Sequence, residues 1–280
     1  RRLENKQRKE TTSTAHHSKK AMHFLIDKRP TLSRSEAKQV YNQFATTSHA
    51  GGKDATSGYG GPAIRVLLSM ASLKNSPHSS SPPKAVLDYG CGQGKLAELV
   101  LQDESLSVKK WVCIDQSPNM VHKAKERLHK FGNVVEVHLL ESGEPLDAVS
   151  SDQLQIVQPQ SMDLFISTYC LDVMSETDMH STLTLAERTL KPSSDSKEIF
   201  AGITWGYRDS IQTCVMTAVW EFLYKFNRKR VGGCRPQMLE PYLKSRGWEV
   251  LECKRTLPDS FPWMVSEVIC ARPPSCCGLN

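Results

Sequence analysis

Residues 85–94 read Ala-Val-Leu-Asp-Tyr-Gly-Cys-Gly-Gln-Gly, an apolar run that reaches an acid and then three glycines on alternate positions. Apolar residues followed by glycines predict a buried strand that enters a tight turn, and residues 95–101 continue with a helical pattern. Glycine tolerates positive φ and lets backbone N–H groups approach a ligand without an intervening Cβ. The stretch therefore predicts a strand, a turn and a helix that form a pocket for an adenosine-type cofactor.

The spacing of the glycines separates this turn from a dinucleotide site. Gly90, Gly92 and Gly94 follow the pattern G-x-G-x-G. The dinucleotide fingerprint G-x-G-x-x-G has its third glycine one residue later, and its turn cradles a pyrophosphate. A cofactor without phosphate allows a carboxylate, here Asp88, at the end of the strand.

A second apolar run, Trp111 to Asp115, also ends in an acid. Ser117-Pro118 then opens a helix through Leu128, because Pro is favoured in the first turn after a Ser cap. An acid at the end of this second strand can accept hydrogen bonds from both ribose hydroxyls of the cofactor. We expect Asp115 to bind the ribose, and the alternative is a solvated acid at a strand end.

The segment Leu87 to Gly94 resembles the first motif of the class I S-adenosylmethionine-dependent methyltransferases, of the kind called methyltransferase domain types 11 and 25. The resemblance covers about residues 84–272. Further segments are similar to later strands and helices of the family, in the same order: 134–140, 162–172, 183–190 with Lys191-Pro192 after it, 199–204, 237–247, 248–253 and 265–271. The sequence departs from the family pattern at two places: Ser-Ser-Asp follows Pro192 in place of glycines, and Glu141 replaces the commoner Asp.

The resemblance implies an α/β fold with a Rossmann-like, doubly wound, seven-stranded sheet in the order 3-2-1-4-5-7-6, strand 7 antiparallel, and an N-terminal helical lid. The implied cofactor is S-adenosylmethionine, with S-adenosylhomocysteine as product and no metal. Glu141 would meet the adenine, and Ser167 and Thr168 would lie over the methionine part. The full set of expected cofactor residues is Asp88, Gly90, Cys91, Gly92, Asp115, Gln116, Met120, Glu141, Ser142, Ser167 and Thr168.

Composition and charge agree with one large domain and short additions. The chain has 280 residues, and no apolar run approaches the ~18 residues of a membrane helix. Residues 1–34 hold ten bases and three acids, a charge of +7, and the other 246 residues hold 26 bases against 27 acids. The core is therefore close to neutral, which argues against a nucleic-acid partner and against membrane insertion.

Nine cysteines without a C-x-x-C pair indicate a reducing compartment. We expect a cytoplasmic protein, with an organelle as the alternative if the basic N-terminus is a remnant of a transit peptide. The sequence leaves the oligomeric state open.

The chain divides by composition into unequal parts. We expect a disordered basic arm over 1–20, a helical lid over 21–75, a Ser/Pro-rich linker over 76–83, the methyltransferase domain over 84–272 and a flexible tail over 273–280. Within the lid, Ser33-x-x-Glu36 predicts a capping box that opens a helix through Phe44, and Gly61-Pro62 predicts a second helix through Leu73. The glycine-rich loop 51–60 between them is interpreted as a lid loop, or as an ordinary surface connection.

Candidate catalytic residues follow from what methyl transfer needs. The sulfonium of the cofactor is already activated, so the protein must hold a nucleophile in line in a dry site and, for a protonated nucleophile, supply a base. Tyr169 and Asp172, at the end of the fourth strand, and Tyr59 on the lid loop are the candidates. For each of them, packing or a satisfied hydrogen bond is an equally good explanation.

Substrate choice is expected to lie in a helical cover at about 205–235 and in the lid. The expected substrate residues are Tyr41, Tyr59, Trp205, Tyr207, Arg208 and Arg235. Arginine suits a carboxylate and aromatic faces suit a cationic sulfur, so a small anionic acceptor is predicted. A solvated basic helix end is the equal alternative.

The function predicted by the resemblance is therefore methyl transfer to a small metabolite, with S-methylation of a thioether acid, like a methylthio-hydroxybutyrate in the dimethylsulfoniopropionate pathway, as a specific candidate. The alternatives are a methyltransferase acting on protein or nucleic acid and a non-catalytic protein that binds the cofactor. Against the first alternative, residues 167–170 read Ser-Thr-Tyr-Cys and not the Asn/Asp-Pro-Pro-Tyr of families that methylate planar amides and adenine.

Overall fold

The computed structural model describes residues 31–46, 60–71, 73, 84–140, 156–192, 197–203, 210–257 and 265–274. The expected basic arm 1–20, residues 51–59 of the lid loop, the whole linker 76–83 and residues 275–280 of the tail lie outside these residues.

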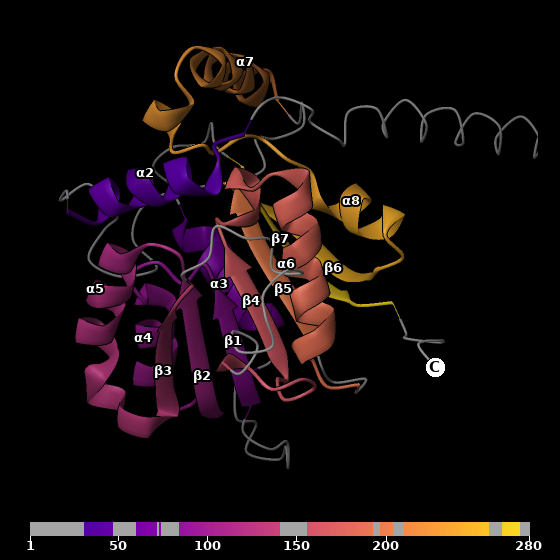
Figure 1. The fold of residues 1–280 in the computed structure, drawn as a ribbon. Coiled ribbons are helices and arrows are strands. Elements are labelled where there is room, and N and C mark those ends of the chain that lie inside the picture. Colours follow the sequence, from indigo (N-terminus) through magenta and orange to yellow (C-terminus); the bar gives the residue numbers. More distant parts are fainter. Residues whose placement is uncertain are drawn as a thin grey trace, which may run out of the picture.

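A seven-stranded sheet forms the centre of the described chain (Figure 1). Its strands are β1 (Lys84–Tyr89), β2 (Val108–Asp115), β3 (Val135–Leu139), β4 (Leu164–Thr168), β5 (Lys197–Ile203), β6 (Glu249–Thr256) and β7 (Ser266–Arg272). They lie in the order β3-β2-β1-β4-β5-β7-β6. The pairs from β3 to β5 are parallel, and β7 runs antiparallel to both β5 and β6. The α/β, Rossmann-like class expected from the sequence is confirmed.

Helices cover both faces of the sheet, because the inner strands carry apolar side chains on alternate sides. Helices α3 (Gly61–Met70), α4 (Lys95–Gln102) and α5 (Pro118–Leu128) pack on the face that holds Val86, Trp111 and Leu164. Helices α6 (Glu176–Thr189) and α8 (Leu239–Ser245) pack on the face that holds Leu87 and Phe165.

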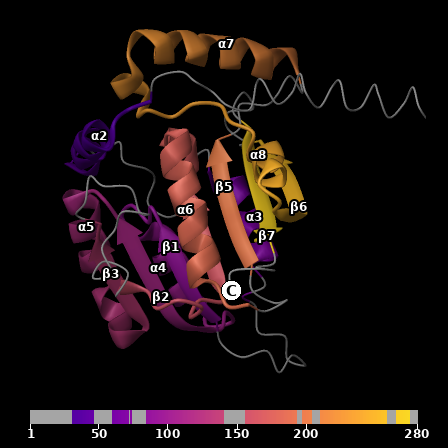
Figure 2. The same cartoon turned by 45° about the vertical axis from the view of Figure 1, so that its right-hand side comes forward.

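Two helices lie beyond the carboxyl ends of the parallel strands (Figure 2). Helix α2 (Arg34–Thr46) packs on α5, and α7 (Ile211–Phe226) is followed by the short 3-10 turn η4 (Arg228–Val231), which also contacts α2. Two further 3-10 turns are η1 (His129–Val134) and η3 (Leu171–Val173). None of the helices described is long and apolar enough to span a membrane.

The expected start of α2 is confirmed. The Ser33 hydroxyl accepts a hydrogen bond from the Glu36 N–H at 3.2 Å, and the Glu36 carboxylate accepts one from the Ser33 N–H at 3.0 Å, which is a capping box. Helix α7 lies within the helical cover expected at about 205–235. Helix α3 ends at Met70, three residues before the expected Leu73.

Candidate active site

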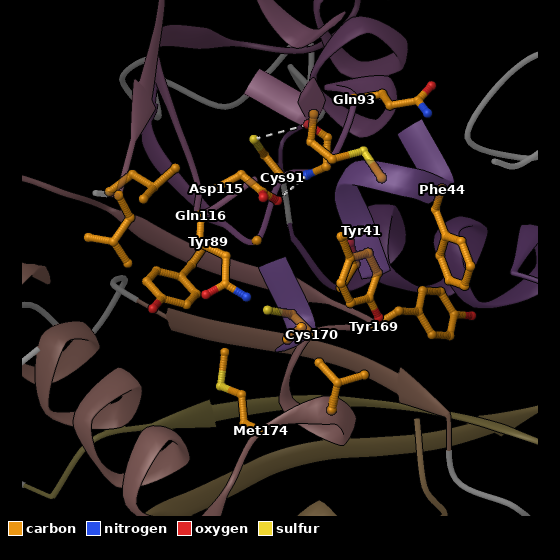
Figure 3. Close-up of a pocket in the computed structure, with 18 of the residues that line it drawn as sticks. Tyr41, Phe44, Tyr89, Cys91, Gln93, Asp115, Gln116, Tyr169, Cys170 and Met174 are labelled. Carbon is orange, nitrogen blue, oxygen red and sulfur yellow. Dashed lines mark hydrogen bonds between the residues drawn. The ribbon is translucent and has the colours of Figure 1, made fainter. Parts of the chain in front are cut away.

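A cavity of about 400 Å³ lies at the carboxyl ends of β1, β2 and β4 (Figure 3). Helix α2 closes it on the side away from the sheet, with Tyr41 and Phe44 on the wall. Nine residues expected from the sequence line it: Tyr41, Gly90, Cys91, Gly92, Asp115, Gln116, Met120, Thr168 and Tyr169. In an open parallel sheet, the crevice at the carboxyl ends of the strands is the usual ligand site.

The glycine turn after β1 has the backbone geometry expected from its sequence. Gly90 and Gly92 have φ of 74° and 54°, values that L side chains rarely adopt. A Cβ on Gly90 would lie 2.4 Å from the Cys170 sulfur, so this glycine allows β1 and the end of β4 to approach. A Cβ on Gly92 would meet no protein atom within 4 Å, because Gly92 faces the cavity.

Asp115, at the end of β2, fixes that turn. Its carboxylate accepts hydrogen bonds from the Gly92 N–H at 2.9 Å and from the Ser117 N–H at 2.8 Å. Burial raises the pKa of Asp115, and the backbone donors oppose the shift because they favour the charged form. Each carboxylate oxygen can accept a further hydrogen bond, so Asp115 can receive a ligand hydroxyl without giving up its hold on the turn.

Polar contacts tie α2 to the elements on both sides of the cavity. On one side of the cavity, the Arg34 guanidinium pairs with the Asp178 carboxylate of α6 at 2.5 Å. On the other side, the Asn42 side-chain oxygen accepts a hydrogen bond at 2.6 Å from the hydroxyl of Ser117, the N-cap of α5. The Tyr41 hydroxyl donates to the Gly232 carbonyl at 3.3 Å. These contacts hold α2 across the cavity.

Tyr169 forms part of the cavity wall next to Gly60. Its φ is 52°, an unfavourable backbone conformation for a bulky residue, and its hydroxyl lies 2.9 Å from the Ser266 hydroxyl at the start of β7. Burial raises the pKa of Tyr169 well above its ordinary value. The phenol is therefore protonated at neutral pH, and it anchors the wall to β7.

Two expected cofactor residues are not on the cavity wall. Asp88 shares its sheet face with Val86, because alternate residues of a strand point to opposite faces, and it is 1% exposed beneath α3, α4 and α5. Neither carboxylate oxygen of Asp88 accepts a hydrogen bond from the described residues. Ser167, one residue before Thr168 on β4, is also fully buried and lies outside the cavity wall.

Asp172 and Arg235 are likewise buried away from the wall. The Cys234 thiol donates to the Asp172 carboxylate at 2.9 Å, and the Arg235 N–H donates to the Asp172 carbonyl at 3.2 Å. The Arg235 guanidinium donates to the Met174 carbonyl at 2.8 Å. They join the segment after η4 to η3, and neither lies on the cavity wall, so their expected catalytic and substrate-binding roles stay predictions.

The remaining expected site residues lie outside the described chain and stay predictions: Tyr59, Glu141, Ser142, Trp205, Tyr207 and Arg208. Among the residues that the structure describes, no cluster of three His, Cys, Asp or Glu side chains could hold a metal ion.

The cavity also contains residues that the sequence did not reveal. Tyr89, Cys170 and Met174 contribute an aromatic ring and two sulfur groups (Figure 3). Tyr89 and Cys170 stand beside expected residues, so their proximity in the chain was the available signal. The Arg34–Asp178 pair had no such signal, since 144 positions separate its members.

Residues 80–195 match the family of methyltransferase domains. The match includes the glycine turn, Asp115 and the strands that frame the cavity, so this part of the chain is similar to methyltransferase domains. No curated protein sequence matches the chain significantly.

Solved structures share the fold. The [4+2]-cyclase SpnF is 16% identical, with 85% of this chain and 93% of that chain covered and a TM-score of 0.53. The mitomycin 7-O-methyltransferase MmcR is 17% identical, with 76% and 55% covered and a TM-score of 0.50. The geranyl diphosphate C-methyltransferase from Streptomyces coelicolor A3(2) is 12% identical, with 75% and 77% covered and a TM-score of 0.50. Similarity at these identities establishes the fold alone.

Proposed function

We propose that this chain transfers the methyl group of S-adenosylmethionine to a small molecule. One observation carries the proposal: the glycine turn, Asp115 and the apolar underside of α2 share a single cavity of about 400 Å³. Ligand pockets for small molecules span roughly 300–1,000 Å³. A cavity of this size suits a metabolite better than a protein or RNA chain.

The residues present fit the cofactor. Gly92 leaves open space where a Cβ would stand, and Asp115 places a carboxylate beside that space for the ribose hydroxyls. Gln116 and Met120 lie beyond Asp115 on the same wall, where we place the adenine. We place Thr168, at the end of β4, beside the methionine part of the cofactor. Glu141 and Ser142 remain proposed adenine contacts.

The bound cofactor supplies an electrophilic methyl group, and the chain must hold the acceptor in line with it and exclude water. Burial raises the pKa values of Tyr169 and Cys170, so both stay protonated at neutral pH and are poor bases. An acceptor atom that carries a lone pair without losing a proton, such as a thioether sulfur, fits this wall. Lys95 is a basic side chain of the wall that could receive the carboxylate of such an acid, whereas Arg34 is already paired with Asp178.

The test combines binding with transfer. Isothermal titration should show S-adenosylmethionine and S-adenosylhomocysteine binding to the full chain. Methyl-labelled cofactor should then label thioether acids in a metabolite panel and leave total protein and RNA unlabelled. Label in protein or RNA would overturn the small-molecule assignment, and binding without transfer to any pool would indicate a non-catalytic protein.

A further inference from the structure

Helix α7 carries an apolar stripe on its outer side. Among its exposed residues are Ile211, Val215, Val219, Phe222, Leu223 and Phe226, of which Ile211 is 84% and Phe226 is 71% exposed. At 100° per residue these positions span about 120° of the helix circumference, the width of a continuous buried face in an ordinary amphipathic helix. The rings of Phe222 and Phe226 lie 4.4 Å apart and contact each other.

The opposite side of α7 is attached to the domain. Thr213 and Tyr224 are buried, and the Trp220 indole donates a hydrogen bond to the Cys234 carbonyl at 2.9 Å. The stripe thus lies on the side of α7 away from these contacts, and α7 itself lies at the end of the molecule beyond the strand ends (Figure 2). Exposed apolar surface on this scale on a soluble domain marks an interaction site.

The charges beside the stripe indicate what it meets. Residues 211–231 contain four bases, Lys225, Arg228, Lys229 and Arg230, and one acid, Glu221. The bases gather at the C-terminal end of α7, next to the two exposed phenylalanines. Lys229 lies 3.3 Å from Glu36 of α2 yet keeps 54% of its side chain exposed, so the end of the helix remains cationic.

A second copy of the chain fits this arrangement poorly. Two α7 helices packed in parallel would bring their basic ends together. Packed antiparallel, each basic end would meet the N-terminal end of the other helix, where the helix dipole is also positive. An anionic surface would attract the basic end of α7 and would cause neither of these repulsions.

We propose that α7 docks on a membrane surface that contains anionic lipids, with Phe222 and Phe226 entering the headgroup region and the basic end contacting lipid phosphates. A helix with an aromatic and aliphatic face beside bases lies in the plane of the interface, and its binding grows with buried apolar area and with anionic charge. This docking does not depend on which methyl acceptor binds in the cavity.

The test is vesicle co-sedimentation of the full chain with phosphatidylcholine vesicles, with and without about 30% phosphatidylserine. We expect binding to the anionic vesicles and about tenfold weaker binding for the double variant Phe222→Ser/Phe226→Ser. Leu251→Ser, which removes an exposed leucine from β6, is the matched control and should bind as the unmodified chain does. Lys225→Gln/Arg230→Gln should lose the preference for phosphatidylserine.

Melting temperatures and cofactor titrations of the variants check that the domain stays folded, since the substituted side chains are exposed. The proposal is overturned if the chain ignores anionic vesicles, or if the double phenylalanine variant binds them as tightly as the unmodified chain. It is also overturned if sedimentation velocity shows a dimer that the double variant abolishes, because the stripe would then be an interface between copies.

Discussion

Asp115 links the glycine turn to the proposed ribose site through one carboxylate. It already accepts N–H groups from Gly92 and Ser117, and a ribose hydroxyl would add a charge-assisted hydrogen bond worth about 1.5–3 kcal/mol. We expect Asp115→Ala to weaken S-adenosylhomocysteine binding by about one to two decades in a calorimetric titration. Glu136→Gln, on the neighbouring strand β3, is the control. Equal affinity in Asp115→Ala and the control would remove Asp115 from the cofactor site.

The glycines of the turn differ in what a side chain would meet. Gly90→Ala combines positive φ with a clash against Cys170, and we expect a loss of about 2–4 kcal/mol of unfolding free energy. Gly92→Ala should lose only about 1–2 kcal/mol, from its positive φ, but should weaken S-adenosylhomocysteine binding because its Cβ enters the cavity.

Gly132 offers a control for the effect of a glycine substitution away from the cavity. Its φ is 57°, close to the 54° of Gly92, and a Cβ there would also meet nothing within 4 Å, but Gly132 is not on the cavity wall. Its ψ of −134° is a conformation that side chains other than glycine avoid, so Gly132→Ala should destabilise the fold at least as much as Gly92→Ala and yet keep full affinity. If both variants bind the cofactor normally, the turn is not where the cofactor lies.

At the scale of elements, α2 is held over the cavity by the Arg34–Asp178 pair, whose side chains are 19% and 21% exposed. We expect Arg34→Met to speed hydrogen exchange of α2 and to lower S-adenosylhomocysteine affinity severalfold. A double-mutant cycle with Asp178→Asn should give a coupling of about 1 kcal/mol, since the pair is only partly shielded from water.

The control for this ion pair is Lys244→Met, which breaks the exposed pair between Lys244 and Glu240 on α8. It should leave α2 unchanged. Exchange in α2 that is equally slow in Arg34→Met and in Lys244→Met would mean that packing on α5, and not the ion pair, holds the helix.

Elements with local signals were predictable from the sequence. The capping box at Ser33 and Glu36 marks the start of α2, and the glycine turn and Asp115 reach the cavity because each directly follows its own strand. Asp88 could not be placed in the same way. Its burial depends on which face of β1 meets α3, α4 and α5, and a long-range packing choice of this kind leaves no mark in a short motif.

Arg235 shows the same limit in another form. Its residue type suits a carboxylate ligand, but in the structure its guanidinium donates to the Met174 carbonyl beside η3. Composition indicates which chemistry is available in a segment. Only the structure shows that this arginine contacts the Met174 and Asp172 carbonyls at η3, a pairing that composition does not indicate.

At the scale of the whole molecule, the carboxyl end of the sheet carries two features that the family match does not explain by itself. The cavity lies under α2, and the apolar stripe belongs to α7. Both helices lie at the same end of the sheet (Figure 2). Docking of α7 would therefore bring the cavity's end of the molecule to the lipid surface, and an amphiphilic acceptor could reach it from there.

The stability of the whole domain should depend on the buried Asp88. Burial raises the pKa of Asp88 from 3.8 to about 7, the charge of Asp115 acts in the same direction, and the nearby Trp111 indole opposes the shift. Because the pKa is higher in the folded state than in the unfolded chain, the contribution of Asp88 is fully present below pH 3.8 and is lost as pH rises through about 7. A shift of this size corresponds to roughly 4 kcal/mol.

The measurement is the difference in unfolding free energy between Asp88→Asn and the unmodified chain, from urea titrations at pH values from 4 to 8. Other shifted carboxyls, such as Glu98 and Glu267, are common to both proteins and cancel. The variant should gain stability relative to the unmodified chain as pH rises, and most of the gain should fall between pH 4 and 7. Glu104→Gln, which neutralises an exposed acid, should show no such trend. A difference for Asp88→Asn that stays flat across this range would mean that Asp88 is ionised in the folded protein and has a counter-charge or water within reach.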